Sequence, residues 1–562
     1  MKGGFRQSMG WLHTWCGLTC GWLLCAILLT GTLSVFREPI TRWMQARPPV
    51  AAAAGTPVAG TPGAAQPQPL AQAVHYLAAH AAGARLWRIE FPAREGDALL
   101  LIWRAGRDNQ HAALHPDTGA PLPRPWGRAT EGGRHFMSFH YLLHAGMPGY
   151  WLVGWVSMCM LVALVSGVVV HRRIFSDFFT FRRGKGQRSW LDAHNATAVV
   201  TLPFLFMIVY TGLFIFYASY MPWPLRTAYG LGDGAYGRFQ AELLHNAAEP
   251  PDRRRSGEAA PLVALAPLLQ QAQALTGQAA RVVVIEHPGD RHATVRVMGR
   301  VDDAADGAQR GGSRTILNPA GSVAFDGVSG ALLQLQRPEP DAPFATEQVH
   351  GVMEALHYAR FGGWPMRWLY FVSGLLGTAM VATGTVLFSV KRRQKSGQKN
   401  GKESGQEFGT ATARVYRAVE VLNVAAVAGI CVASIGYFYA NRLLPVDLPG
   451  RAVWEIRCFL VLWAATLLHA AVRPHRSSWV EQLGAAALLC VALPLLNAAT
   501  TGQHLVGYLL AGDGQRAGVE LTALACGAAL GFAAWRLGRG PSGQALAASA
   551  PSPCAPAGKA RA

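Results

Sequence analysis

The stretch that decides the fold is LHYARFGGWPMRWLYFVSGLLGTAMVATGTVLFSVKRR, at residues 356–393. An earlier stretch, FHYLLHAGMPGYWLVGWVSMCMLVALVSGVVVHRR at residues 139–173, aligns with it without a gap, and His140 then meets His357. Such self-similarity marks an internal repeat. Each copy contains an apolar run of about 20 residues, which as a helix crosses the roughly 30 Å hydrocarbon layer of a membrane. The sequence therefore predicts two equivalent transmembrane helices, each preceded by a histidine and followed by basic residues.

A second repeat supports the first. His13 precedes an apolar run that ends in Thr30-Gly31, and His194 precedes one that ends in Thr211-Gly212, with the same spacing in both. The dipeptides at the matching places in the other pair of runs are Ser166-Gly167 and Thr383-Gly384. The chain therefore uses one unit twice: a helix, a polar segment and a second helix, with histidines at the helix ends.

Composition and charge place the chain in a membrane. At 562 residues and 51% hydrophobic content, it is too long for one domain and too apolar for a soluble protein. Its net charge of +19 reflects Lys and Arg clusters beside the apolar runs, at residues 2–6, 172–188, 391–395, 473–476 and 536–539. By the positive-inside rule these clusters are cytoplasmic, as is the amino terminus. No nucleic-acid partner is expected, because membrane topology accounts for the charge.

The nine cysteines indicate neither a disulfide framework nor a thiolate metal site. Eight of them fall in or beside apolar runs, one lies in the carboxy-terminal tail, and no C-x-x-C motif occurs. We therefore interpret the membrane cysteines as small packing residues.

The predicted fold class is an all-α membrane bundle of about eight transmembrane helices with two small α+β domains outside the membrane, built by internal duplication. Each small domain is expected to hold a helix, two strands and a turn, which is LHPDTGAPL in the first and TILNPAGSVAFDG in the second. Both termini are expected in the cytoplasm. The predicted segments are a first transmembrane helix (1–47), a linker and first small domain (48–139), transmembrane helices two and three with a basic cytoplasmic loop (140–220), a second small domain (221–349), a fourth transmembrane helix (350–393), a cytoplasmic linker (394–414), a four-helix extension (415–540) and a disordered cytoplasmic tail (541–562).

Histidines are the most distinctive reactive side chains of the apolar segments. A histidine in or near a bilayer costs free energy to place, so it needs a partner. Water or lipid phosphate explains a single one, but not four at repeat-equivalent positions. We expect His13 and His194 to pair near the cytoplasmic face, and His140 and His357 to pair near the outer face. Paired imidazoles on facing helices are what a bis-histidine haem needs, which predicts haem b, either two or one per chain.

Three further histidines are candidate ligands. His144, one helical turn after His140, is an alternative to that residue, His171 is an alternative to His13, and His350 precedes the fourth span. A carboxylate-bridged di-iron site is a competing interpretation, because Glu347-x-x-His350 and Glu354-x-x-His357 resemble half of such a site. The apolar runs offer no convincing glutamates for the other half.

Several motifs carry a family resemblance, namely WLHTWCGLTCG with LLTGTLSVF, FHYLLH with VSGVVVHRR, SWLDAHNATAVVTLPF with YTGLFIF, LHYARFGG with ATGTVLF, and the turn LHPDTGAPL. Through them, residues 5–393 resemble the PepSY-associated transmembrane family, also called iron-regulated or iron-uptake membrane proteins. Two departures stand out. The chain reads LPFLFM around Leu205 where relatives often read LPFHLM, and the four helices after Lys395 lie outside the resemblance.

The resemblance implies two periplasmic PepSY domains between helices of a bacterial inner membrane, and b-type haems that pass electrons to ferric siderophores. His13, His194, His140 and His357 match the helix-end histidine motifs of the family. Reduction of Fe(III) to Fe(II) weakens its hold on hard oxygen ligands and so releases the iron. The implied activity is that of a membrane ferric-siderophore reductase. Its expected partners are membrane lipids, ferric siderophore, and quinol or another electron donor, because no flavin or nicotinamide domain occurs in the sequence.

Two other functions stay open. PepSY modules also act as inhibitory or interaction domains, so a regulatory membrane protein without redox activity is one alternative. A transporter of an iron chelate is the other, although the apolar runs show little buried charge for a polar substrate path.

Overall fold

The computed structural model describes residues 2–50, 67–94, 96–106, 108–171, 182, 187–232, 234–243, 253–300, 320–338, 345–399 and 410–539. Eight helices in these ranges are long and apolar enough to cross a membrane, which confirms the predicted bundle. The eight spans are Gly4–Ser34, Gly146–Val170, Gln187–Ile215, Gly363–Val390, Arg414–Leu443, Arg451–Val472, Arg476–Thr501 and Gly514–Gly538. Most of the predicted linkers and of the basic loop, and all of the predicted tail, lie outside the described residues.

The chain divides into two compact units. The first comprises Met1–Phe388 with Pro445–Arg451, and the second comprises Ser389–Leu444 with Ala452–Ala562. The division falls near the end of the repeated part of the sequence. The four-helix extension therefore forms a unit of its own.

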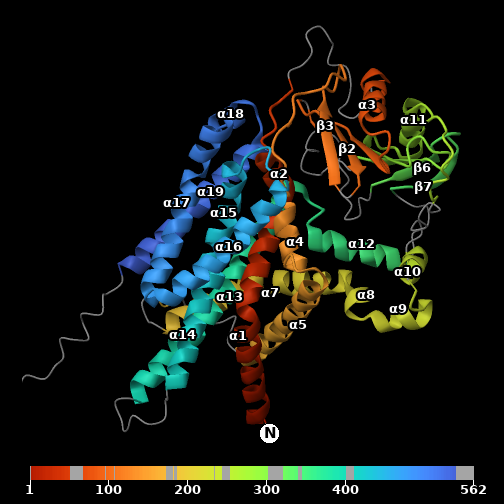
Figure 1. Cartoon of the computed structure of the whole chain (residues 1–562). Helices are drawn as coiled ribbons and strands as arrows, with labels where there is room; N and C mark the ends of the chain where they lie inside the picture. Colours follow the sequence, from red (N-terminus) through yellow and green to blue (C-terminus); the bar gives the residue numbers. More distant parts are fainter. Residues whose placement is uncertain are drawn as a thin grey trace, which may run out of the picture. The chain divides into compact units, whose positions relative to one another are not determined.

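In the first unit, helices from the two repeats pack side by side. α1 lies along α4 and α5, and α7 lies along α5 and α12 (Figure 1). The histidine-bearing ends of the second and fourth predicted helices are separate short helices, α4 and α12. Apart from two helices on the sheet described below, the described helices of this unit are α1 (Lys2–Ser34), α2 (Arg37–Gln45), α4 (Arg134–Leu142), α5 (Gly146–Val170), α7 (Gln187–Ile215), α8 (Tyr217–Tyr220), α9 (Pro222–Tyr229), α10 (Ala235–Leu243), α12 (Ala345–Tyr358) and α13 (Gly363–Lys399), which continues into the second unit from Ser389.

A sharp turn separates α4 from α5, and an equivalent turn separates α12 from α13. Gly146 has a φ of +62° in the first turn, and its repeat equivalent Gly363 has a φ of +60° in the second. Glycine reaches this left-handed region without the steric cost that other residues bear. Because of these turns, α4 and α12 run in directions that differ from those of the membrane helices that follow them.

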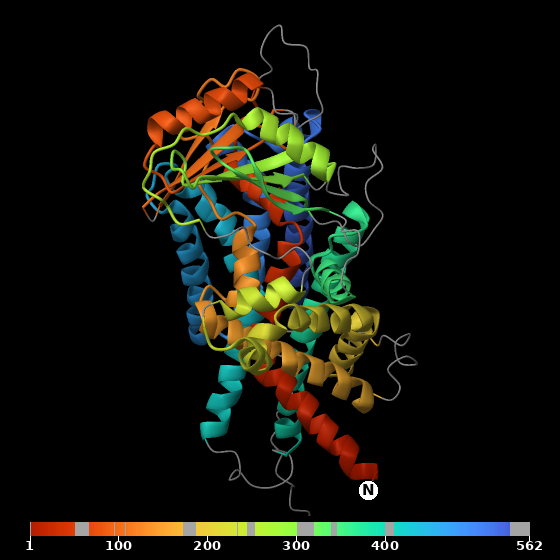
Figure 2. The same ribbon diagram turned by 90° about the vertical axis from the view of Figure 1, so that its right-hand side faces the viewer.

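The two polar segments form a single antiparallel sheet of seven strands, in the order β3-β2-β1-β4-β5-β6-β7. Two helices, α3 (Pro67–His80) and α11 (Leu265–Thr276), cover one face of it (Figure 2). Apolar side chains of both helices and of the strands share one buried core, which includes Leu77, Leu101, Leu268 and Val297. The strands are β1 (Leu86–Glu90), β2 (Leu99–Ala105), β3 (Asp108–Leu114), β4 (Ala280–Glu286), β5 (Thr294–Gly299), β6 (Ser322–Asp326) and β7 (Leu332–Gln336).

The junction of the two predicted small domains lies between β1 and β4. These strands pair antiparallel, with Leu86 opposite Glu286, Arg88 opposite Val284, and Glu90 opposite Val282. An unpaired strand edge leaves backbone N–H and C=O groups without partners, so joining two such edges satisfies both. The two small α+β domains are therefore present as halves of one sheet.

The turn predicted in the second half falls partly outside the described residues. Residues 315–319 of TILNPAGSVAFDG are outside the described residues, and residues 322–326 form β6. The turn equivalent to LHPDTGAPL begins at Asp326, whose side chain accepts from the N–H groups of Val328 (2.9 Å) and Ser329 (2.8 Å). In the first half, His115 occupies the same place and its Nδ1 accepts from the N–H of Asp117 at 3.2 Å.

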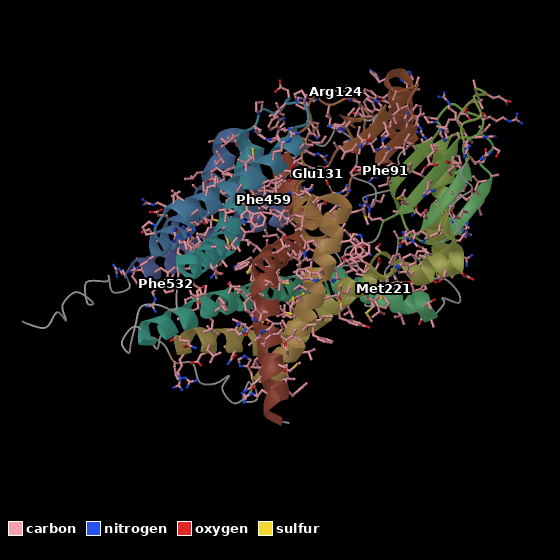
Figure 3. All side chains as sticks on the ribbon, turned by 60° about the horizontal axis from the view of Figure 1, so that its bottom comes forward. Phe91, Arg124, Glu131, Met221, Phe459 and Phe532 are labelled. Atoms are coloured by element: carbon pink, nitrogen blue, oxygen red, sulfur yellow. The ribbon has the colours of Figure 1, made fainter. Side chains whose placement is uncertain are left out.

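The regular secondary structure of the second unit is helical in its described residues. Phe459 is fully buried in it, whereas Phe532 is 62% exposed, as a lipid-facing side chain would be (Figure 3). Its elements are α14 (Thr410–Val424), a π-helical turn η1 (Ala425–Gly429), α15 (Ile430–Leu443), α16 (Arg451–Val472), α17 (His475–Thr501), α18 (Leu505–Leu510) and α19 (Gly514–Gly538).

A buried polar network joins the helix ends of the second unit. Asn441 donates to Glu455 at 2.7 Å, Arg442 donates to Asn497 at 2.9 Å, and Asn497 donates to Glu520 at 2.7 Å. All five side chains are at most 2% exposed. The expectation of little buried charge in the spans was therefore wrong. The charged groups lie within two turns of helix ends, and neighbouring helices bury them there. Each hydrogen bond to a buried charge stabilises the packing of those ends.

We predict that Asp326→Asn destabilises the sheet in a pH-dependent way. Burial alone would raise the pKa of Asp326, but the N–H groups of Ser329 and Val328 and the Arg253 guanidinium outweigh it and lower the pKa. A carboxylate with a lowered pKa stabilises the fold above its unfolded-state value of about 3.9, and this contribution is lost as the pH falls through the folded-state value. The variant should have a lower thermal midpoint at pH 7, and the gap should narrow below about pH 4. A gap that is constant with pH would contradict this account.

Candidate functional site

The four repeat-equivalent histidines share one mode of attachment. Each ring Nδ1 lies within hydrogen-bond distance of a backbone carbonyl oxygen on a neighbouring membrane helix. The contacts are His13 to Ala163 (2.8 Å), His140 to Ile27 (2.8 Å), His194 to Met380 (2.8 Å) and His357 to Ile208 (3.0 Å). In every case the carbonyl belongs to the residue three places before the Ser or Thr of a Ser/Thr-Gly dipeptide.

The glycine of each dipeptide makes room for the imidazole. A Cβ atom at Gly31 would lie 2.6 Å from the His140 ring, and one at Gly212 would lie 2.8 Å from the His357 ring. At Gly167 and Gly384, a Cβ atom would lie 3.0 Å from His13 and 3.1 Å from His194. Distances this short displace one of the two groups. The Ser/Thr-Gly dipeptides are therefore docking sites for the histidines, a role that their fourfold recurrence in the sequence signalled and the sequence interpretation missed.

The attachment fixes the tautomer of each ring. A carbonyl oxygen can only accept a hydrogen bond, so the Nδ1 that faces it carries the proton. In a neutral imidazole the other nitrogen, Nε2, then keeps its lone pair. This is the arrangement in which a histidine binds a metal through Nε2 while its Nδ1–H is held by a carbonyl of the protein.

The four rings meet in two pairs, and each pair joins the two repeats. The ring centroids of His13 and His194 are 6.3 Å apart, and we call these residues the first pair. The centroids of His140 and His357, the second pair, are 6.2 Å apart. Two imidazoles that share one metal ion have centroids roughly 6 Å apart, with about 2 Å for each metal–nitrogen bond and about 1 Å from each nitrogen to its ring centre.

The two pairs lie at different levels of the same helices. α1 bears His13 and accepts from His140 at Ile27, about 20 Å further along at 1.5 Å per residue. α7 repeats this pattern with His194 and Ile208. Between them on α7, Leu205 is fully buried and packs beside Gly377, so the departure from the family pattern at this position is an apolar packing contact.

The three further candidate histidines have different surroundings. The ring of His171 lies 6.1 Å from that of His13 and meets it edge to face. His144 stacks on His135, with 2.9 Å between its Nε2 and the Nδ1 of His135. The Nε2 atom of His144 is therefore engaged by His135 and not by the second pair. The ring of His350 lies 6.3 Å from that of Phe214.

The di-iron interpretation gains no support from the acidic residues. Glu354 forms an ion pair with Arg360 at 3.6 Å, and Nδ1 of His357 is held by Ile208. Among the described residues, no group of three or more His, Cys, Asp and Glu side chains is placed to hold a metal ion. Each histidine pair thus offers two ligands. A metal ion bound there would need other donor atoms for its remaining coordination positions.

Comparison with known proteins found a matching family model and a similar protein. Residues 10–391 match the family model described as the PepSY-associated TM region. The chain is 27% identical over 420 residues to the "Uncharacterized protein PA4219" of Pseudomonas aeruginosa, and the match covers 72% of this chain and 94% of that relative. Because the family model spans more than half of the chain, including all four docked histidines, this protein belongs to the PepSY-associated TM family.

Proposed function

We propose that the two histidine pairs bind two b-type haems and that the protein carries electrons across a bacterial inner membrane. The observation that carries this proposal is the fourfold docking of an imidazole on a Ser/Thr-Gly dipeptide, which leaves Nε2 as the nitrogen with a lone pair in each ring and brings the rings together in two pairs. A bis-histidine haem iron alternates between Fe(III) and Fe(II) and thereby takes up and gives off one electron at a time.

The residues present fit such a group. Two neutral imidazoles would supply the two axial ligands, and the macrocycle would supply the other four nitrogens, so a pair of histidines from the described residues is enough for each haem. Space is also available: a Cβ atom at Gly17, one turn from His13, would meet no atom within 4 Å. The same holds at Gly146, which follows the helix that bears His140.

The protein residues would orient the axial ligands and tune their basicity. A hydrogen bond from Nδ1 to a carbonyl fixes the ring plane and makes Nε2 a stronger donor. The docking glycines hold each ring against its helix, so that rotation about the side-chain bonds is restricted. Near the second pair, the Tyr370 hydroxyl donates to the carbonyl of Leu356 at 2.6 Å and so ties the end of α12 to α13.

The electron acceptor that we propose is a ferric siderophore or a similar oxidised compound in the periplasm, and the activity is that of a membrane reductase serving iron acquisition. This part of the proposal rests on the family resemblance. In the orientation given by the positive-inside rule, the second pair and the seven-stranded sheet face the periplasm. Quinol or another protein supplies the electrons on this account, and Fe(II) leaves its oxygen ligands more readily than Fe(III).

Haem quantification with histidine variants tests the proposal. We expect two b-type haems per chain in the purified protein, measured by a dithionite-reduced minus oxidised spectrum. His13→Ala should retain one haem and His357→Ala should retain one, because each removes a ligand from a different pair. His350→Ala, whose ring contacts Phe214, is the matched control and should retain two. A protein without haem after expression with adequate haem supply would contradict the proposal and favour a PepSY interaction protein.

Glycine variants test the docking geometry. Gly31→Ala should lower the haem content from two to one per chain, because its Cβ atom would lie 2.6 Å from the His140 ring. Gly10→Ala on the same helix is the control, since its Cβ atom would meet nothing closer than Val170 at 3.9 Å. We expect the control to keep both haems and an unchanged spectrum. Retention of both haems in Gly31→Ala, with the spectrum of the unmodified protein, would show that His140 does not dock at this glycine.

A further inference from the structure

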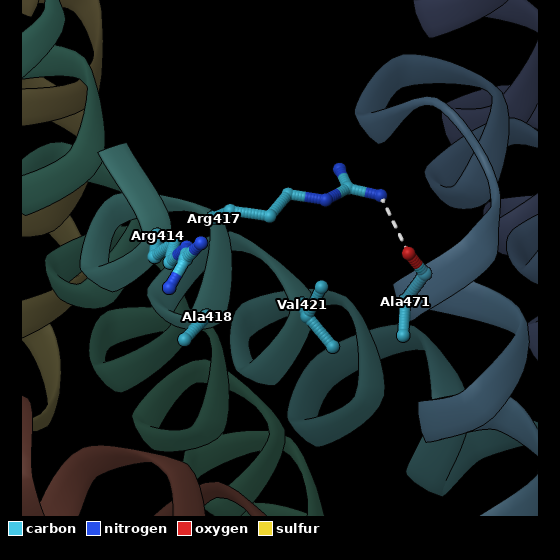
Figure 4. A pocket seen from close by; sticks show the side chains of 5 residues that line it. All are labelled: Arg414, Arg417, Ala418, Val421 and Ala471. Atoms are coloured by element: carbon cyan, nitrogen blue, oxygen red, sulfur yellow. Dashed lines mark hydrogen bonds between the residues drawn. The ribbon is translucent and has the colours of Figure 1, made fainter. Parts of the chain in front are cut away.

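A groove of about 570 Å³ lies in the second unit between one stripe of α14 and the end of α16. Arg414, Arg417, Ala418 and Val421 line it from α14, and Ala471 lines it from α16 (Figure 4). Residues three, four and seven places apart share one face of a helix, which is why these side chains meet. The floor of the groove is apolar and its rim carries two guanidinium groups.

The two arginines are bound differently. Arg417 reaches across the groove and donates to the carbonyls of Ala470 (3.0 Å), Ala471 (3.1 Å) and Arg473 (2.5 Å) (Figure 4). These carbonyls are at the end of α16, where a helix leaves such groups without internal partners. Arg414 is exposed and has no acceptor among the described residues. The positive charge at the rim is therefore available to a ligand.

Two further arginines, near the end of α16 and the start of α17, have partners of their own. The Arg473 guanidinium is paired with Glu481, and the Arg476 guanidinium donates to the carbonyl of Leu537 at 2.8 Å. The groove also lies where two spans end, since Arg414 begins one and Val472 ends another. At that depth the apolar interior of a membrane gives way to lipid headgroups.

The helix surface beside the groove is apolar and open. Leu468 is 68% exposed and Val472 is 81% exposed on α16, and Val415 is 60% exposed on α14. In a membrane, acyl chains cover side chains of this kind. A ligand that combines an anionic head with acyl chains therefore matches both the rim and its surroundings.

We propose that this groove binds one anionic glycerophospholipid, with its phosphate at Arg414 and Arg417 and its acyl chains along α16. Basic pockets between the ends of membrane helices bind anionic headgroups in this way. The proposal does not depend on the haem sites, because all of its residues belong to the second unit.

Lipid titration of the delipidated full-length protein in a nonionic detergent, read by native mass spectrometry, tests the proposal. Phosphatidylglycerol should bind to one saturable site, and Arg414→Gln should weaken it about fivefold, the effect of one lost charge near a headgroup. Val421→Trp keeps both arginines but fills the groove, and it should weaken binding as well. Arg539→Gln is the matched control, because this arginine packs on Trp535 at 4.4 Å at the end of another span.

The outcomes separate a built site from general lipid association. Binding of phosphatidylglycerol that Arg414→Gln and Arg539→Gln weaken equally would overturn the proposal, as would equal binding of zwitterionic phosphatidylcholine. Competition by inorganic phosphate would show a site for free phosphate and not for a lipid, and would also overturn it. Since Arg414 is exposed, its substitution leaves the fold intact, and an unchanged elution volume in size-exclusion chromatography checks this.

Discussion

The structure depends on one contact that is made four times: an imidazole Nδ1–H donates to a helix carbonyl, and a glycine one turn later admits the ring. Each contact joins two helices of one repeat, as His13 joins α1 to α5. The pairing of rings then joins one repeat to the other. A polar side chain in an apolar bundle thereby gains the partner that it needs, and its second nitrogen keeps a lone pair that this contact does not use.

The duplication gives this arrangement its symmetry. Each half contributes one histidine to each pair, so neither half holds a complete site. The same relation holds outside the membrane, where β1 of one half pairs with β4 of the other and the two halves share one core. Both the sheet and the histidine pairs therefore require the two repeats to be present together. The second unit, by contrast, is held by its own network around Arg442 and Asn497.

The sequence allowed the bundle, the repeats and the facing of His13 with His194 to be predicted, because equal spacing in two repeats places equivalent groups at equivalent depths. It did not reveal the shared sheet, since the pattern within a strand does not say which edge it meets. The turn at Asp326 was missed because it lacks the proline of LHPDTGAPL. The burial of Glu455 and Glu520 was missed for a related reason: hydropathy treats charges near helix ends as exposed, and only tertiary packing decides otherwise.

The central claim is that each facing pair of imidazoles holds one iron between two Nε2 atoms. The electron paramagnetic resonance spectrum of the oxidised full-length protein tests it most directly, because the spin state and symmetry of ferric haem report its axial ligands. The account predicts two low-spin bis-imidazole signals, one of which disappears in His194→Ala and the other in His140→Ala. High-spin ferric haem in the unmodified protein, or low-spin signals that survive both substitutions, would contradict it.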